Sequence, residues 1–200
     1  MQTAITRDVS RSLGACELSY VERALIDVNL AERQHLAYRQ ALQSLGCRVI
    51  ALAAEHELPD AVFVEDVALV FDEIAIRTRP GAVTRRAEVE SVANALESYR
   101  AVRSIDAPGT LDGGDVLRIG RTIYIGRSAR TNAAAMQQLG AFVSASALGG
   151  QGYAVQPVSI RDCLHLKSAI TEVGDGVVLI NPEWVDRAPF AHLRQIEIDP

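Results

Sequence analysis

The sequence predicts an α/β protein built from repeated units, each with two strands followed by a helix. Two observations lead to this prediction. Residues 63–99, 111–143 and 165–193 each contain two alternating apolar runs separated by a short polar or glycine-containing turn. Corresponding polar residues recur about 50 residues apart in these stretches, which indicates a repeated supersecondary unit.

Ahead of the repeats, the chain predicts one helix and one strand. The stretch LAERQHLAYRQALQSLG has apolar residues at helical spacing and closes on a glycine, so we predict a helix from Asn29 to Leu45. CRVIALAA, residues 47–54, is apolar and follows directly, which predicts a strand. The proline in LPD, residues 58–60, then breaks the chain before the first repeat.

The three repeats share one order of elements. Each predicts a strand, a tight turn and a second strand, because turn residues flanked by alternating apolar runs are typical of hairpins. In the first two units, a loop with arginines and a helix follow, and in the third, a loop and a helix. The predicted turns are Asp72-Glu73, Gly120-Arg121 and Gly174-Asp175-Gly176.

The composition of the chain narrows the classes of protein to which it can belong. The 200 residues are 48% hydrophobic and 22% charged, as expected for one globular domain. A net charge of −5 without a basic stripe argues against nucleic-acid binding. No signal-peptide core and no segment of membrane-spanning length occur, which favours a cytoplasmic protein without membrane partners. Three widely spaced cysteines, with no Cys-x-x-Cys pair, argue against disulfides and zinc.

Each repeat opens with acidic residues or a histidine, namely Glu65 and Asp66, then Asp112, then His165. If the units pack around a pseudo-symmetry axis, these strand starts converge, and loop arginines ring the same mouth. On this geometry the arginines are Arg85 or Arg86, and Arg127 or Arg130. By pattern alone, the same residues also fit scattered surface charges on an α/β protein.

These residue types point to a ligand class. A carboxylate beside a histidine fixes its tautomer and stabilises its protonated form. Several acids around a pocket favour a cationic group, and arginines at the rim favour a carboxylate. Together they describe a site for a small zwitterion with a cationic side chain, such as an amino acid bearing a guanidinium. LDGGDV lacks a P-loop lysine, so its glycines are interpreted as permitting a close turn beside Asp112.

Five motifs, in order, carry a family resemblance: LPDAVFVEDVALV, TRPGAVTRRAEV, TLDGGDVL, GRSARTN and LHLKS. From about Arg7 to its end, the chain resembles the dimethylarginine dimethylaminohydrolases, which have the pentein fold, a five-bladed α/β propeller. The resemblance implies hydrolysis of asymmetric dimethylarginine and monomethylarginine to L-citrulline and the methylamine, through a covalent cysteine intermediate and with neither metal nor organic cofactor. Arginine deiminases and amidinotransferases share the DGGD and histidine pattern, but they match the residues of the other motifs less well.

The resemblance also implies roles for individual residues. His165 would be the general acid and base, and Asp112 the acid that supports it. The remaining six residues would bind or cover the substrate. Asp60 and Asp66 would hold the guanidinium beside Glu65, Arg85 and Arg130 would bind the carboxylate end, and Leu18 would belong to a lid loop.

The nucleophile is the residue that the resemblance leaves without a match. In the family it lies near the C-terminus, in the fifth unit, and none of Cys16, Cys47 and Cys163 matches that position. We therefore expect residues 1–200 to be a single pentein-type domain whose last unit is missing, with the cysteine beyond Pro200. Two alternatives stay open: a hydrolase of arginine or another guanidino compound, and a non-catalytic binding protein that lacks the nucleophile. A homodimer is compatible with the sequence.

Overall fold

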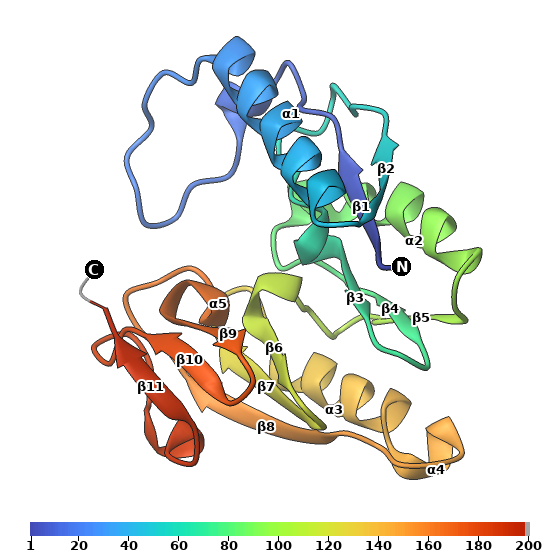
Figure 1. The fold of residues 1–200 in the computed structure, drawn as a ribbon, viewed down its shortest axis with the longest axis vertical. Coiled ribbons are helices and arrows are strands. Elements are labelled where there is room, and N and C mark those ends of the chain that lie inside the picture. The colour runs from blue at the N-terminus through green and yellow to red at the C-terminus, as the bar shows by residue number, and fades with distance from the viewer. Residues whose placement is uncertain (199–200) are drawn as a thin grey trace.

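The computed structural model describes residues 1–198, which form four small sheets (Figure 1). The first pairs β1 (Thr3–Arg7) in parallel with β2 (Arg48–Leu52), joined through α1 (Val28–Ser44). The helix and the strand predicted here are confirmed within two residues at each end. The Asp27 side chain caps α1 by accepting a hydrogen bond from the Leu30 N–H at 3.0 Å.

The next two sheets follow the predicted unit plan. An antiparallel pair is extended by a third strand that lies parallel to the second, after a helical crossover. One sheet contains β3 (Ala68–Val70), β4 (Ala75–Arg77) and β5 (Val102–Ser104), with α2 (Val89–Glu97). The other contains β6 (Val116–Ile119), β7 (Thr122–Arg127) and β8 (Ala154–Ser159), with α3 (Ala133–Phe142) and α4 (Ala145–Leu148).

The fourth sheet departs from the prediction in its crossover. β9 (Ile170–Gly174) and β10 (Val177–Ile180) form the expected hairpin, and β11 (Arg194–Glu197) joins in parallel. The predicted helix between them is wrong, because only the 3-10 turn η5 (Ala188–Phe190) forms there. Pro189 lies within this segment, and a proline inside a helix removes a backbone donor and clashes with the preceding turn.

The polar residues that open each unit lie in short helical turns or directly before them, not at strand starts. Glu65 and Asp66 belong to η2 (Val64–Val67), and Asp112 precedes η4 (Gly113–Asp115). His165 is the N-cap of the single-turn helix α5 (Leu166–Ala169), so its predicted place at a strand start is wrong. A run of four or five alternating residues fits a strand and a helical turn equally well.

Shared apolar clusters fix neighbouring units against each other. One cluster joins β4, β7 and α3 through Ile76, Ile125 and Leu139, all fully buried. A second joins the β6–β8 sheet to the β9–β11 sheet, where the rings of Tyr124 and Phe190 lie 4.6 Å apart. The turns at the ends of these sheets are therefore held in fixed relative positions. Within residues 1–198, no helix is both long and apolar enough to cross a bilayer.

Candidate active site

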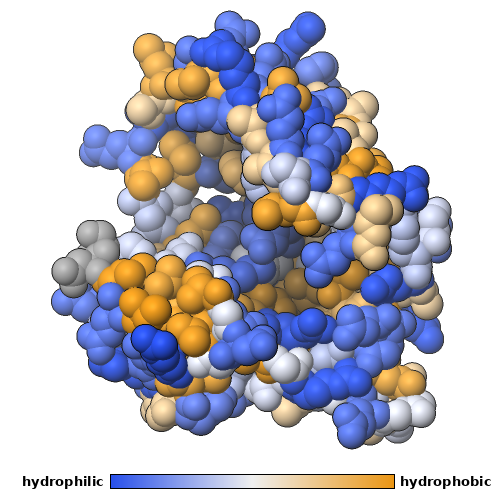
Figure 2. All heavy atoms as spheres, viewed as in Figure 1, coloured by the Kyte–Doolittle hydropathy of each residue, from blue (hydrophilic) through white to orange (hydrophobic). Residues whose placement is uncertain are grey.

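The helical turns η2 and α5 meet η3 (Val83–Glu88) around a cavity of about 560 Å³. The space-filling view shows the molecule hollowed between its N-terminal part and the sheets below (Figure 2). Seven of the eight residues predicted from the sequence line the cavity: Leu18, Asp60, Glu65, Asp66, Arg85, Arg130 and His165. The eighth, Asp112, is fully buried and contacts His165. Arg86 and Arg127, the alternatives to Arg85 and Arg130, do not line it.

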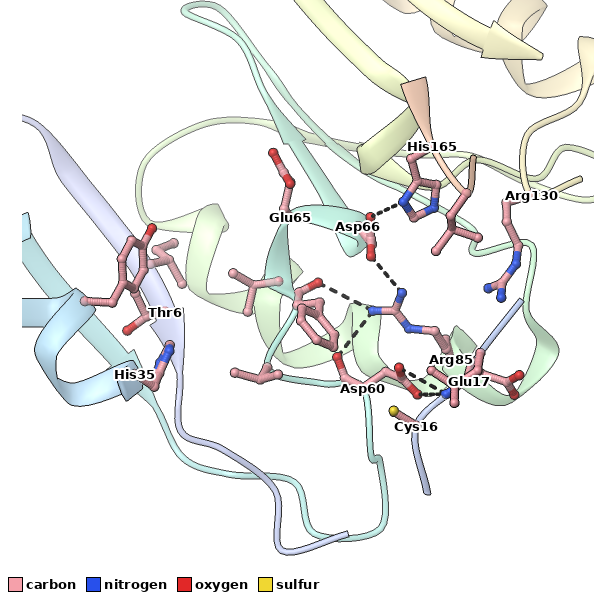
Figure 3. A pocket seen from close by; sticks show the side chains of 17 residues that line it. Thr6, Cys16, Glu17, His35, Asp60, Glu65, Asp66, Arg85, Arg130 and His165 are labelled. Carbon is pink, nitrogen blue, oxygen red and sulfur yellow. Dashed lines mark hydrogen bonds and ion pairs between the residues drawn. The ribbon is translucent and has the colours of Figure 1, made fainter. Parts of the chain in front are cut away.

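His165 lies between two aspartates. Its Nε2 atom is 3.2 Å from Asp112 Oδ2. On the other side of the ring, its Nδ1 atom is 4.0 Å from Asp66 Oδ1 (Figure 3). Burial by itself would lower the pKa of His165, but the contact with Asp112 and the charges of Asp66 and Asp115 outweigh it and raise the pKa. The imidazole therefore keeps its proton to higher pH than an exposed histidine does, as a proton donor requires.

Asp66 is held by a buried arginine. Arg85 Nη1 donates to Asp66 Oδ2 at 2.7 Å, and its Nη2 donates to Glu88 Oε2 at 2.9 Å. The Arg85 and Glu88 side chains are only 5% and 2% exposed, so this is a buried acid–base–acid group. The guanidinium neutralises Asp66 on one side, while Asp66 Oδ1 faces His165 on the other.

The glycines of LDGGDV allow the two units to approach closely. The backbone N–H of Gly114 donates to Asp66 Oδ1 at 2.9 Å. A Cβ atom at Gly114 would lie 2.4 Å from His165 Nδ1, and one at Gly113 would lie 1.9 Å from the Glu65 carbonyl oxygen. Any larger residue at either position would push η2 or His165 away. The interpretation of these glycines as a close turn beside Asp112 is confirmed.

The segment after η1 (Leu13–Ala15), which carries Leu18, is tied to the cavity wall. The backbone N–H of Glu17 donates to both oxygens of Asp60, at 3.3 and 3.0 Å. Burial raises the pKa of Asp60, against the lowering effects of this hydrogen bond and of Arg85. Arg130 Nη2 donates to Ser19 Oγ at 3.2 Å, so a rim arginine also reaches the segment.

Two cations pair with acids of the site. Arg130 Nη1 lies 3.7 Å from Asp112 Oδ2, and its side chain is 12% exposed, so it keeps access to a ligand. Lys167 Nζ pairs with Glu65 Oε1 at 2.5 Å, where the Glu65 side chain is 67% exposed. Arg130 thus reaches the buried Asp112, whereas Glu65 and Lys167 pair close to solvent.

Comparisons with known proteins identify the family to which this chain belongs. The sequence model of the family described as N,N dimethylarginine dimethylhydrolase, eukaryotic, matches residues 15–193. A Streptomyces coelicolor dimethylarginine dimethylaminohydrolase is 44% identical over 177 residues, 88% of this chain and 67% of the relative. The chain belongs to the dimethylarginine dimethylaminohydrolase family. Its Pseudomonas aeruginosa relative of the same name is 36% identical over 86% of this chain and 66% of the relative, so residues 1–200 span about two thirds of these proteins.

Solved structures of this family have the same fold. The Pseudomonas aeruginosa dimethylarginine dimethylaminohydrolase, a cysteine-to-serine mutant complexed with citrulline, superposes with a TM-score of 0.91 at 34% identity, covering 99% of this chain and 76% of that one. The N-terminal domain of a cyanobacterial arginine dihydrolase, bound to product, gives 0.82 at 17% identity, covering 98% and 74%. The second likeness shows the fold alone. The pentein-type α/β fold is confirmed.

The three cysteines of this dimethylarginine dimethylaminohydrolase family member are either buried or outside the cavity lining. Cys16 lines the cavity but is buried in an apolar cluster with Val9 and Leu13. Cys163 Sγ donates to the carbonyl oxygen of His165 at 3.5 Å, and burial raises its pKa. Cys47 is partly exposed and lies outside the cavity lining. A nucleophilic thiol needs a lowered pKa and access to the ligand, and apolar burial opposes both.

Sequence reasoning missed two buried acids that organise the site. Glu88 pairs with Arg85, and Asp115 accepts hydrogen bonds from Ser128 and Thr131. The spacing of Arg85 and Glu88, three residues apart in a helical segment, was a signal for the first pair. Asp115 stands in the quoted motif, but its position before an apolar strand gave no sign of its partners.

Proposed function

We propose that this site binds methylated arginines and hydrolyses asymmetric dimethylarginine and monomethylarginine to L-citrulline and the methylamine, through a covalent cysteine intermediate. One observation carries the proposal: His165 stands between Asp112 and Asp66 in a cavity that also presents Arg130. Anionic groups next to a histidine, opposite a cationic rim, match a zwitterion with a guanidinium side chain. The names of the relatives give the same substrate class.

The charges orient the substrate. The guanidinium would lie against Asp66 and Asp60, where Glu65 shapes the edge of the cavity. The carboxylate would meet Arg130, with Arg85 adding positive charge from behind Asp66. Leu18, on the segment that covers Asp60, would exclude water from the ligand. In this proposed arrangement the guanidinium carbon would lie beside the His165 imidazole.

The proposed reaction uses His165 twice. A thiolate attacks the guanidinium carbon, and protonated His165 gives its proton to the departing methylamine, which leaves an S-alkyl thiouronium on the cysteine. Neutral His165 then accepts a proton from water as it attacks the same carbon. The tetrahedral adduct expels the thiolate and releases citrulline. The raised pKa of His165 supports the first proton transfer.

The proposed nucleophile is a cysteine outside residues 1–200. Support comes from the buried environments of Cys16 and Cys163 and from relatives of which this chain spans about two thirds. We accordingly propose that residues 1–200 form one pentein-type domain that works together with this cysteine. We also propose that the protein is cytoplasmic. It could form a homodimer, and size-exclusion chromatography would distinguish a homodimer from a monomer.

Residues 1–200 should bind asymmetric dimethylarginine and release no citrulline. Isothermal titration calorimetry should give one site per chain, because all acids and arginines of the site are present, and a colorimetric citrulline assay should stay at background. Tighter binding of arginine than of dimethylarginine would favour the alternative function, a hydrolase of arginine or another unmethylated guanidino compound. Release of citrulline would overturn the nucleophile proposal, and Cys16→Ser and Cys163→Ser would then identify the thiol. No binding of any guanidino compound would overturn the proposed function.

Replacing Arg130 with alanine should weaken dimethylarginine binding about 10- to 100-fold, the usual value of a charge-assisted hydrogen bond. The matched control is Arg127→Ala, which removes an exposed arginine at the end of β7, three residues before Arg130. A dimethylated guanidino amine without the carboxylate should bind Arg130→Ala and wild type equally well. Equal losses for both ligands in calorimetry would show that Arg130 does not receive the carboxylate.

A further inference from the structure

Asp115, the second acid of LDGGDV, is fully buried and takes no part in the proposed reaction. Its carboxylate accepts three hydrogen bonds from two other segments. Oδ2 accepts from Ser128 Oγ at 2.5 Å and from Thr131 Oγ1 at 2.6 Å, and Oδ1 accepts from the backbone N–H of Leu166 at 3.1 Å. A buried carboxylate with this many donors is a fixed junction between segments, because losing any one of them leaves a buried polar group unsatisfied.

Two of these connections lead to the catalytic pair. Leu166 directly follows His165, so the bond to its N–H fixes the backbone from which the imidazole projects. Thr131 Oγ1 accepts a hydrogen bond from the backbone N–H of Asp112 at 3.2 Å, while it donates to Asp115. The contact between His165 and Asp112 is therefore set from both sides by one carboxylate.

The third connection leads to Arg130, the residue proposed to bind the carboxylate of the substrate. Ser128 Oγ donates to Asp115 and accepts hydrogen bonds from the backbone N–H groups of Arg130 and Thr131, at 3.0 and 3.2 Å. This turn fixes where the Arg130 side chain starts. This route runs through the Ser128 hydroxyl, whereas the route to Asp112 runs through the Thr131 hydroxyl.

Gly126 provides the space for the junction. A Cβ atom there would lie 2.9 Å from Asp115 Oδ1 and 2.9 Å from Leu166 Cβ. The strand β7 thus passes close behind the carboxylate, and the junction is enclosed by backbone as well as by hydrogen-bond donors. Solvent does not reach it, since Asp115 is 0% exposed and Thr131 only 4% exposed.

We propose that Asp115 is a positioning residue with two separable actions: through Thr131 and Leu166 it sets His165 against Asp112, and through Ser128 it sets Arg130. Only the action on Arg130 needs the proposed substrate for its test. The action on His165 can be measured on the free chain, so failure of the proposed function and failure of this inference give different results.

Thr131→Val tests the first action. Loss of the hydroxyl frees the Asp112 backbone, loosens its contact with His165, and should shift the imidazole titration, followed by NMR, to lower pH than in wild type. Thr131→Ser keeps the hydroxyl and should restore the wild-type titration. Ser144→Ala is the control, because Ser144 caps α4 through its own hydroxyl and does not line the cavity.

Ser128→Ala tests the second action. It should weaken dimethylarginine binding about fivefold, the effect of one ordinary hydrogen bond, and leave the His165 titration in place. Asp115→Asn should change both properties. If Asp115→Asn does not fold, the two hydroxyl variants still decide. Folded Thr131→Val and Ser128→Ala proteins that both behave like wild type, or that change both properties equally, would overturn the proposal.

Discussion

Replacing His165 with alanine should lower the rate of citrulline formation by about two to four powers of ten, the usual contribution of a general acid–base group. The polypeptide to use is whichever one releases citrulline, residues 1–200 or a longer chain that contains them. His165 supplies the proton to the leaving amine and later removes one from water, so both halves of the reaction lose their catalyst. Dimethylarginine binding should change much less, because Asp66, Asp60 and Arg130 remain.

The measurement is a time course of citrulline at saturating substrate, with binding followed separately by calorimetry. His192→Ala is the matched control, since this histidine is exposed and does not line the cavity. A His165→Ala protein with near-normal turnover would remove His165 from the reaction. A variant that bound substrate far more weakly but turned it over normally at saturation would make His165 a binding residue instead.

The sequence predicted which residues gather at the site better than it predicted how they are held. Asp66, His165 and Arg85 were recognised from ordered motifs, and the structure brings them to one cavity. The buried partner Glu88 was not found, because an acid in an arginine-rich helical segment looks the same whether it faces solvent or the core. Long-range pairings such as that of Gly114 with Asp66 have no local signal at all.

The predicted type of element was wrong where the sequence pattern was short. Residues 164–167 alternate between apolar and polar as in a strand, yet Leu166–Ala169 forms one helical turn. The 17-residue helix α1 was predicted closely because several turns repeat the same spacing. The difference is physical. The conformation of a single turn depends on tertiary hydrogen bonds, here the bond from the Leu166 N–H to Asp115, whereas a long helix can also be predicted from the periodicity of its sequence.

Replacing Arg85 with alanine should lower the free energy of unfolding by about 3–5 kcal/mol, since it leaves two buried carboxylates without their counter-ion. Asp66 and Glu88 both pair with this guanidinium, and the Glu88 side chain is 2% exposed. Burial already raises the pKa of Glu88, against the opposing effect of Arg85, and removal of the arginine should raise it further. Urea denaturation followed by circular dichroism gives the measurement.

Three comparisons make this result specific to buried charge. Arg77→Ala, which breaks the exposed pair of Arg77 with Glu90, should cost less than about 1 kcal/mol. Adding Glu88→Gln to Arg85→Ala should recover part of the loss. The deficit should also shrink as pH falls through the raised pKa of Glu88, because the folded variant then binds a proton more tightly than the unfolded chain does. A deficit that is constant with pH and indifferent to Glu88→Gln would mean that Arg85 stabilises the fold by packing, and that Asp66 is held in front of His165 by Gly114 and the turn η2 rather than by charge.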